Sequence, residues 1–402
     1  MLEIEISYTW GSDEPTLASL VTEFSRQTGV QIHLRRLDWA KAWVDLFTTA
    51  TEGEGSDVSI IGSTWVSTLA KMDALRPFTS DEVATLGPET AFLRPTWKNA
   101  KLAGDQRVWS IPWAGWMYVI FYRKDLLESI GIDPTGAFST PDAVRTTLAA
   151  LKTSTLEIPW LNADIPHPYG DTIHTAASWV WAAGGEFINP GGDRAQFDTP
   201  QAISGLVHWL DTYRSVAEQY QRLSVAECRE LVMQGRAAAA LVDINTAQTL
   251  LHPDGSSLDR ENIGFANLSN IPWVGGGSFV IWDHTRLHPE REQAALDLVR
   301  FLSSKKANLR WMRQSDLLPL RLDALKECYP AGSPLQPVVT LAARQGGSYY
   351  NVPHWRRFEA RVCLELGAII QEARENPSAD SQTILLKHLG PAARQLNLLL
   401  GK

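Results

Sequence analysis

Three tryptophans stand where three predicted β-strands end: Trp10, Trp39 and Trp65. Residues 2–8, 32–37 and 58–61 have the apolar patterns of strands, and a helical pattern follows each of them. We therefore expect parallel strands joined by helices, in a sheet that binds its ligand beyond the carboxyl ends of the strands. Large flat rings at three such ends predict a ligand with an apolar face and a polar edge, as a sugar ring has.

Two carboxylates also stand at strand ends. Asp38 precedes Trp39, and Asp243 follows a short apolar strand at residues 237–242. The oxygens of each carboxylate can accept two hydroxyl hydrogen bonds, and such bonds count for more in a closed, dry cleft. These acids are therefore candidates to hold the polar edge of the ligand.

Signatures of several other chemistries are missing from the sequence. It contains no P-loop, no GxGxxG after a strand, no HExxH and no GxSxG. The three glycines at 275–277 lack the Lys-Ser that follows a phosphate-binding loop, and the nine histidines show no metal-ligand spacing. We therefore expect no catalytic residue, no cofactor and no metal ion.

Composition limits the class of protein and its partners. A chain of 402 residues is long for one compact core and natural for two domains. The net charge of −8, without any basic run, argues against nucleic acid as a partner. No apolar stretch is long enough to span a bilayer, and three widely spaced cysteines form a poor disulfide framework. Sixteen tryptophans exceed ordinary usage, and tryptophan is favoured on recognition surfaces.

Helices can be placed from their caps and from apolar periodicity. One helix is expected at about residues 15–28, with a stop at Gly29. Further helices should begin after the N-cap residues Thr140 and Thr199, each followed by proline, and after the capping box of Ser224 with Glu227. The middle of the chain is therefore rich in helix.

Strands recur late in the chain. Residues 113–122 are apolar almost throughout, which predicts one strand buried on both faces. After a long helical section, strands are expected again at 263–266 and 278–282. The chain should therefore return to its first domain and cross between two lobes more than once, an arrangement that favours a hinge.

The succession of several local runs resembles the family 1 extracellular solute-binding proteins of ABC sugar importers, the maltodextrin-binding type. The runs follow one another in the order of that family over essentially the whole chain. They are Leu37–Trp43, Ser56–Trp65, Ile111–Trp113, Phe121–Leu127, Ser178–Phe187, Phe197–Ala202, Gly235–Ala238, Gly275–Ser278 and Asp316–Pro319.

This resemblance implies an α/β, two-lobe periplasmic-binding-protein-like fold of type II, with three hinge crossings and a ligand cleft between the lobes. The N-terminal lobe would contain residues 1–112 and 280–316, and the C-terminal lobe residues 113–279 and 317–402. The lobes of such a protein close over a sugar, and the closed form is offered to a membrane permease. We expect a monomer that binds carbohydrate and ABC permease subunits.

The resemblance also implies which residues line the cleft. One wall would contain Trp10, Ser12, Asp38, Trp39, Thr64 and Trp65, while Trp113 and Trp116 would lie by the hinge. The other wall would contain His174, Trp179, Asp243, Asn245, Trp273, Gly276, Tyr350 and Trp355. Trp43 is expected to pack in the core, and Trp179 is expected to be the exposed member of the pair that it forms with Trp181.

Two segments depart from the family pattern. Relatives often carry an acidic residue and then an arginine after the hinge Pro-Trp, where this chain has Trp116-Met117-Tyr118. Relatives commonly have Gly-Pro-Trp where this chain has Asp243-Ile244-Asn245. We infer a site that depends more on stacking and less on ionic hydrogen bonds, with Trp179 or Trp273 supplying the second lobe's stacking surface.

Two other classes of function stay open. A carbohydrate-active enzyme also combines tryptophan platforms with carboxylates, but it needs a pair of acids that flank the scissile bond. A binder of a non-sugar solute, such as a polyamine or a metal complex, needs acidic cages or ligand clusters. We expect an exported protein, periplasmic or at the cell surface and lipid-anchored, whose signal peptide is absent from this sequence.

Overall fold

The computed structural model describes all residues except 10–13, 165–170, 253–255, 257 and 401–402. The chain forms two compact units, each built from separate stretches of sequence. The first unit contains Met1–Trp116, Val274–Pro330 and Ser348–Arg356. The second contains Met117–Trp273, Ala331–Gly347 and Arg357–Lys402. No helix among the described residues is both long and apolar enough to cross a membrane.

The first unit is built on a seven-stranded sheet with the order β11-β5-β10-β3-β1-β2, in which β4 also pairs with β10. Strand β1 is parallel to β2 and β3, whereas β10 is antiparallel to β3 and to β5. The strands are β1 (Glu3–Tyr8), β2 (Gln31–Arg36), β3 (Val58–Gly62), β4 (Leu75–Arg76), β5 (Ile111–Trp116), β10 (Gly275–Trp282) and β11 (Leu318–Pro319).

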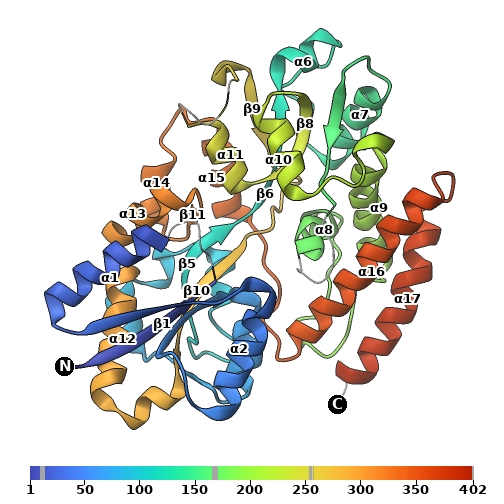
Figure 1. Cartoon of the computed structure of the whole chain (residues 1–402). Coiled ribbons are helices and arrows are strands. Elements are labelled where there is room, and N and C mark those ends of the chain that lie inside the picture. Colours follow the sequence, from blue (N-terminus) through green and yellow to red (C-terminus); the bar gives the residue numbers. More distant parts are fainter. Residues whose placement is uncertain (10–13, 165–170, 253–255, 257, 401–402) are drawn as a thin grey trace. The chain divides into compact units, whose positions relative to one another are not determined.

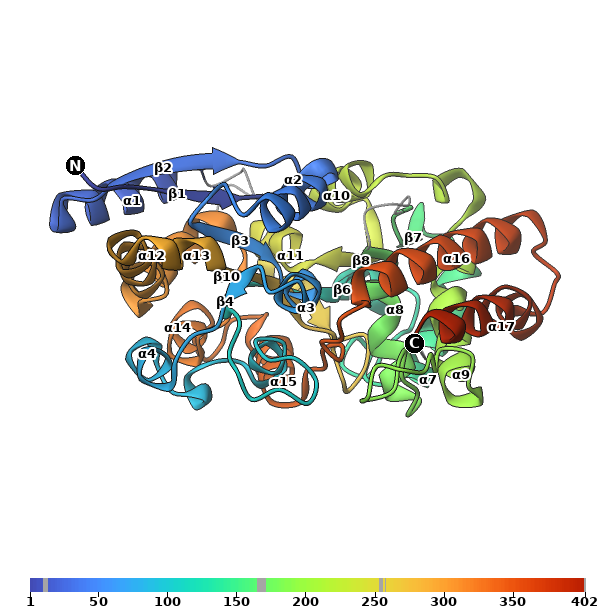
Figure 2. The ribbon, with the colours of Figure 1, turned by 90° about the horizontal axis from the view of Figure 1, so that it is seen from below.

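Helices cover both faces of this sheet, and α1, α12 and α13 lie along one of them (Figure 2). The helices of the unit are α1 (Glu14–Thr28), α2 (Trp39–Glu52), α3 (Val66–Lys71), α4 (Ser80–Leu86), α5 (Arg94–Lys98), α12 (Pro289–Leu302), α13 (Lys305–Ser315) and α14 (Leu322–Cys328). A short 3-10 helix, Ser63–Trp65, joins β3 to α3.

Alternation along the strands explains the two layers of core. In β10, Phe279 and Ile281 pack in the cluster formed with α1, α12 and α13, while Val280 and Trp282 pack in the cluster formed with α2 and α3. Successive side chains of a strand point to opposite faces, so an uninterrupted apolar run is what a sheet with helices on both faces requires.

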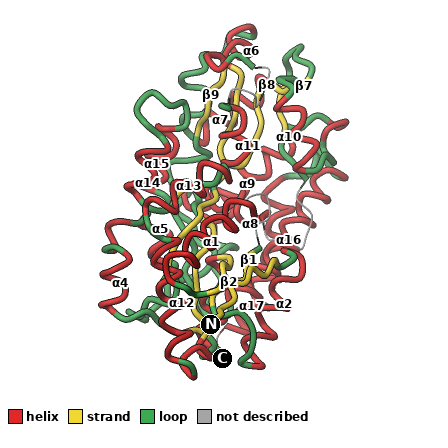
Figure 3. The backbone as a smooth tube through the Cα atoms, turned by 60° about the vertical axis from the view of Figure 1, so that its left-hand side comes forward, coloured by secondary structure: helices red, strands yellow, loops and turns green. Residues whose placement is uncertain are grey.

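The second unit contains a four-stranded sheet with the order β7-β8-β6-β9. Strand β6 (Tyr118–Arg123) is antiparallel to β8 (Ala237–Asp243) and to β9 (Ile263–Ala266), while β7 (Ile158–Leu161) is parallel to β8. Figure 3 shows β7, β8 and β9 in yellow, with α10 (Val225–Met233) and α11 (Ile244–Leu250) beside them.

Two long C-terminal helices, α16 (Trp355–Glu375) and α17 (Ser381–Leu400), run side by side in Figure 1. Helix α17 packs on α9 (Pro200–Arg214), which packs on α8 (Asp171–Ala182). The unit also contains α6 (Lys124–Ser129), α7 (Pro141–Lys152) and α15 (Gln336–Gln345). The predicted caps are confirmed, because the side chains of Thr140, Thr199 and Ser224 each accept a hydrogen bond from a backbone N–H in the first turn of α7, α9 and α10.

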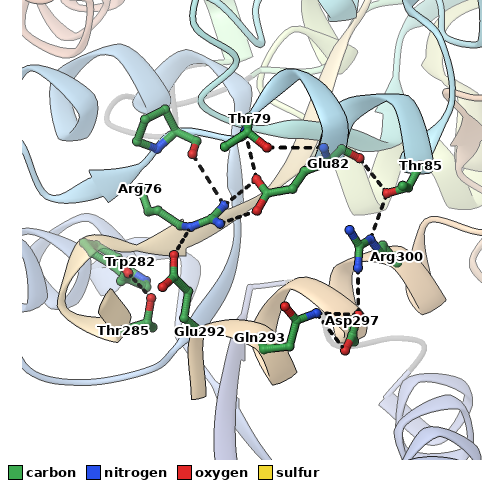
Figure 4. Close-up of polar contacts among 11 residues, drawn as sticks. Arg76, Thr79, Glu82, Thr85, Trp282, Thr285, Glu292, Gln293, Asp297 and Arg300 are labelled. Carbon is green, nitrogen blue, oxygen red and sulfur yellow. Dashed lines mark hydrogen bonds and ion pairs between the residues drawn. The ribbon is translucent and has the colours of Figure 1, made fainter. Parts of the chain in front are cut away.

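A buried arginine ties β4 to two helices of the first unit (Figure 4). The Arg76 guanidinium, whose side chain is 7% exposed, donates to Glu82 of α4 and to Glu292 of α12. Figure 4 also shows a more exposed arginine, Arg300, which donates to Thr85 and to Asp297. The two arginines therefore link the same helices at different depths.

Residues 113–122 form two strands instead of the single strand that we expected. Strand β5 ends at Trp116 and belongs to the sheet of the first unit, whereas β6 begins at Tyr118 in the sheet of the second unit. Hydrophobic pattern alone does not separate two buried strands that are joined by one residue.

The boundaries of the units also differ from the lobes drawn from the sequence. Residues 113–116 and 274–279 belong to the first unit because β5 and β10 pair along their length. Residues 317–330 belong there as well, because β11 pairs with β5.

Candidate ligand-binding site

The first unit gathers several strand ends at one edge of its sheet. Strands β1, β2 and β3 are parallel, and β5 runs in the same direction because both β3 and β5 are antiparallel to β10. Their carboxyl ends therefore meet at one edge, where ligands of open α/β sheets bind. Trp39, Trp65 and Trp116 are at this edge.

The tryptophans that follow β2 and β3 form one cluster. The rings of Trp39 and Trp65 are stacked with 4.9 Å between centroids, and the edge of Trp43 contacts Trp65 at 5.8 Å. Gly62, the last residue of β3, lies against this cluster, since a Cβ atom there would be in van der Waals contact with Trp65 at 3.6 Å and with Trp39 at 3.7 Å. Trp65 is only 5% exposed and supports the partly exposed Trp39 from behind.

Polar groups stand next to this cluster. The exposed side chain of Asp38 caps α2, and its Oδ1 accepts a hydrogen bond from the Ala40 N–H. Within the described part of the chain its other oxygen has no partner, so it can accept from a ligand. Thr64 is partly exposed in the turn between β3 and α3. Trp10 and Ser12, which we expected on the same wall, lie outside the described residues.

Trp113 and Trp116 both belong to β5 but differ in their exposure to solvent. Trp113 is 1% exposed and packs against Phe279 and Trp311, with 4.8 and 4.6 Å between ring centroids. Trp116 is partly exposed at the end of the strand. Trp113 is therefore a core residue, whereas part of the Trp116 side chain is accessible to solvent.

Three residues that we expected on the wall of the second lobe belong to the first unit: Gly276, Tyr350 and Trp355. A Cβ atom on Gly276 would lie 2.0 Å from the Ala114 carbonyl oxygen, and its φ is +139°, so glycine is required for the pairing of β10 with β5. Trp355 is 1% exposed and packs on Tyr349. Tyr350 is partly exposed, and the Lys98 ammonium lies 3.9 Å from its ring centroid.

The second unit has a comparable edge. Tyr118 begins β6 and pairs in register with Asp243, which ends β8. Asn162 follows β7, which is parallel to β8, so it lies at the same edge. A cavity of about 30 Å³ opens here, lined by Tyr118, Asn162, Ala163, Val225, Cys228, Arg229, Leu241, Val242, Asp243 and Thr246.

An aromatic stack stands beside this edge. The ring of His174 lies on that of Trp273 with 4.2 Å between centroids and 11° between planes, and Trp273 lies 6.0 Å from the ring of Tyr118. Burial lowers the pKa of His174 to about 3, so its imidazole is neutral and has one donor and one acceptor nitrogen. Trp273 is held by its backbone N–H, which donates to Ser178 Oγ at 2.8 Å.

The side chains of Asp243 and Asn245 are both held in place by hydrogen bonds within the protein. The Asp243 carboxylate caps α11 by accepting from the Thr246 N–H at 2.7 Å, and burial raises its pKa. Asn245 Oδ1 accepts from the Arg229 guanidinium at 2.6 Å. Such anchored groups are suited to a ligand whose hydroxyls arrive in fixed positions, because their orientation is set before binding.

Trp179 is not the exposed member of its pair. Both Trp179 and Trp181 are buried, at 3% and 7% exposure. Helix α9 approaches so closely that a Cβ atom on Gly205 would lie 2.4 Å from the Trp179 carbonyl oxygen. Trp273, the other candidate for the second stacking surface, is also buried, at 5% exposure, and the ring of His174 covers one of its faces. Its partner His174 is 13% exposed.

The model of one protein family, described as bacterial extracellular solute-binding protein, matches residues 19–332. This match spans most of the chain. The chain belongs to the bacterial extracellular solute-binding proteins. A comparison with curated proteins yields no match.

Several solved structures have the same fold as this chain. Maltose-bound MalE3 of T. maritima has a TM-score of 0.78 at 19% identity, covering 99% of this chain and 100% of that one. MalE of Xanthomonas citri has a TM-score of 0.78 at 18% identity, with coverages of 99% and 97%. A solute-binding protein of Thermotoga lettingae bound with α-D-tagatose has a TM-score of 0.75 at 17% identity, with both chains covered in full. The predicted two-lobe periplasmic-binding fold is thereby confirmed.

In this solute-binding protein, sequence reasoning left three neighbours of the site out of the list of contacts. Tyr118 was noted only as part of a departure from the family pattern, yet it begins β6 beside Trp273. Arg229 anchors Asn245 from a different helix, which no local pattern signals. Trp43 was expected to be core and is partly exposed. Its position one turn after Trp39 is the signal that pointed to the cluster.

The arrangement offers flat apolar surfaces next to fixed hydrogen-bonding groups. Among the residues that the structure describes, no group of three or more His, Cys, Asp or Glu side chains is placed to hold a metal ion.

Proposed function

We propose that this solute-binding protein captures a sugar, either an oligosaccharide or a glycoside, and delivers it to an ABC import permease without transforming it. The observation that carries the proposal is the stack of Trp39 on Trp65 beyond the carboxyl ends of β2 and β3, which are both parallel to β1, in a chain of the solute-binding family. Indole faces pack on the C–H faces of sugar rings, while carboxylates and amides take their hydroxyls.

The ligands of proteins with the same fold support this choice. Their structures include complexes with maltose, α-D-tagatose and ribitol, all of which present several hydroxyl groups. For this chain we propose Asp38, Trp39, Thr64, Trp65 and Trp116 as contacts in the first unit. In the second unit we propose Tyr118, His174, Asp243, Asn245 and Trp273. Tyr350 remains a further proposed contact, and Trp10 and Ser12 remain part of the proposal from the sequence alone.

The proposed mechanism is differential affinity. A sugar that contacts both lobes only when they are closed shifts the equilibrium toward the closed form by the difference between its affinities for the two forms. The permease would then recognise the closed form. We further propose that the protein acts as a monomer outside the cytoplasm, held at the membrane by a lipid anchor.

A sugar panel tests the proposal. The protein is mixed with monosaccharides, maltodextrins and aryl or alkyl glycosides, and its melting temperature is recorded, followed by calorimetric titration of each sugar that stabilises it. We expect saturable binding of at least one sugar, and chromatography of the incubated mixture should return that sugar unchanged. A hydrolysed or transferred product, or the absence of binding throughout the panel, would contradict the proposal.

A further inference from the structure

A second cavity, of about 400 Å³, lies within the second unit and contains none of the residues proposed to bind sugar. Its walls come from α7, α9 and α16 and from the segments that follow α9 and α16. The lining residues are Arg145, Leu148, Ala149, Lys152, Asp211, Tyr213, Arg214, Ser215, Gln221, Ile370, Ala373, Arg374 and Pro377. Its volume is within the range of about 300–1,000 Å³ that is usual for sites of small molecules.

Positive charge dominates the lining of this cavity. Arg145, Lys152, Arg214 and Arg374 face one acid, Asp211, in a protein whose net charge is −8. Leu148, Ala149, Ile370, Ala373 and Pro377 supply an apolar wall. Guanidinium and ammonium groups in a partly desolvated cavity bind carboxylates through short, charge-assisted hydrogen bonds.

Helix capping accounts for part of this charge. Lys152, Arg214 and Arg374 stand in the last turns of α7, α9 and α16, where cations interact favourably with the helix dipole. Lys152 Nζ donates to the Arg214 carbonyl at 3.3 Å, and Arg214 donates to the Ala379 carbonyl at 2.8 Å. Arg145 stands in the middle of α7, where its exposed side chain lies 3.8 Å from the Asp142 carboxylate one turn earlier.

Two of the arginines that line the cavity, Arg214 and Arg374, also make or lack hydrogen bonds away from it. The Nε–H groups of Arg214 and Arg374 are buried and have no acceptor among the described residues. Arg374 uses its terminal nitrogen instead, in a 3.2 Å ion pair with Asp164. These two Nε–H groups have almost no accessible surface, so the cavity is lined by the other parts of the two arginine side chains.

The carboxylate of Asp211 indicates that a ligand of this cavity should also carry hydrogen-bond donors. Its carboxylate lines the cavity and, within the described part of the chain, has neither a side-chain hydrogen bond nor an ion pair within 4.0 Å. A ligand that combines an anionic head with hydroxyl donors would satisfy both the arginines and this carboxylate. A singly charged carboxylate suits a site beside Asp211 better than a doubly charged phosphate, because repulsion grows with the charge of the ligand.

We propose that this cavity is a second ligand site, which binds a small hydroxylated carboxylate through Arg145, Lys152, Arg214 and Arg374, with Asp211 accepting from its hydroxyls. The site is independent of the proposed sugar contacts. Occupancy would join α7, α9 and α16 and stabilise the second unit, since a ligand that binds only the folded protein raises its stability.

Calorimetric titration with sodium D-gluconate tests this proposal. Sodium propionate has the same head group without hydroxyls, and we expect it to bind about tenfold more weakly or worse. The double variant Arg145→Gln/Lys152→Gln removes two exposed cations and should weaken gluconate binding by about tenfold or more. Asp211→Asn removes a like charge and should therefore strengthen propionate binding, whereas gluconate should gain less or bind more weakly because it loses the acceptor for its hydroxyls.

A matched double variant controls for net charge. Arg194→Gln/Arg260→Gln removes two exposed cations of the same unit that do not line the cavity, and gluconate affinity should stay within about twofold of the wild type. Equal affinity of wild type and Arg145→Gln/Lys152→Gln would overturn the proposal. So would a failure of the wild type to bind gluconate, or a gluconate response that Trp39→Ala abolishes, since the anion would then occupy the sugar site.

Discussion

The imidazole of His174 lies flat on the indole of Trp273, with 4.2 Å between ring centroids and 11° between ring planes. The stack presents a neutral hydrogen-bonding ring beside a flat apolar one, because burial lowers the pKa of His174 to about 3. A carboxylate oxygen of Glu359 lies 3.9 Å from His174 Nε2, a distance too long for a hydrogen bond. His174 therefore enters the proposed site without a charge.

This buried histidine makes the protein sensitive to acid. In the unfolded chain His174 takes up a proton below about pH 6.5, whereas the folded protein keeps it neutral down to about pH 3. Its contribution to stability is therefore complete above the unfolded pKa and is lost as the pH falls toward the folded pKa. We predict that His174 alone lowers the free energy of unfolding by about 2 kcal/mol between pH 7 and pH 5.

Urea denaturation at the two pH values measures this loss. His174→Gln keeps a polar side chain that does not titrate, so the difference between pH 7 and pH 5 should be smaller in the variant by about 2 kcal/mol. An equal loss of stability in wild type and variant would show that other groups cause the acid sensitivity.

The tryptophan cluster predicts separate effects on affinity and stability. Trp39→Ala removes a partly exposed ring and should weaken sugar binding by roughly 1–3 kcal/mol with little effect on folding, and Trp116→Ala should do the same. Trp65→Ala removes the buried ring behind Trp39, so it should also lower the free energy of unfolding by about 3–5 kcal/mol.

Trp97 is the matched control for these substitutions. It is 2% exposed in the same unit, stacks on Phe92 at 5.1 Å and is not among the proposed sugar contacts. Trp97→Ala should lower stability and leave the calorimetric affinity for sugar unchanged. If Trp39→Ala and Trp116→Ala also left affinity unchanged, the proposed site in the first unit would be rejected.

Local features of the fold could be predicted from sequence because they depend on neighbours along the chain. Thr140, Thr199 and Ser224 cap their helices as expected, since each side chain reaches a backbone N–H only three residues ahead. The parallel arrangement of the first strands also follows from the alternation of strand and helix patterns.

Exposure of the individual tryptophans could not be predicted in the same way. Trp113 is buried by Trp311, and Trp179 is covered by α9, partners that are distant in sequence. A strand end or a helical position tells which face a ring points to, but not which element packs there. The same limit applies to Arg229, which reaches Asn245 from α10.

The two arginines of Figure 4 allow a test of how burial changes the contribution of an ion pair to the free energy of unfolding. Arg76→Met leaves Glu82 and Glu292 in a largely buried place without their cation, and it should lower the free energy of unfolding by about 3–5 kcal/mol. Arg300→Met, at a side chain that is 31% exposed, should cost about 1 kcal/mol or less. Urea denaturation of both variants compares them, and equal losses would contradict the argument from burial.

Gly276 offers a test of whether a glycine among the predicted site residues acts through the backbone. Its φ is +139°, and a Cβ atom would lie 2.0 Å from the Ala114 carbonyl oxygen, so Gly276→Ala should force β10 away from β5. We predict a loss of about 2–4 kcal/mol in the free energy of unfolding, the sum of backbone strain and overpacking.

Gly104→Ala is the control, because Gly104 also has a positive φ, +78°, but no atom within 4 Å of the added Cβ. That variant should lose only about 1 kcal/mol. Equal losses would mean that conformational strain alone, and not the close approach of β5, requires glycine at position 276.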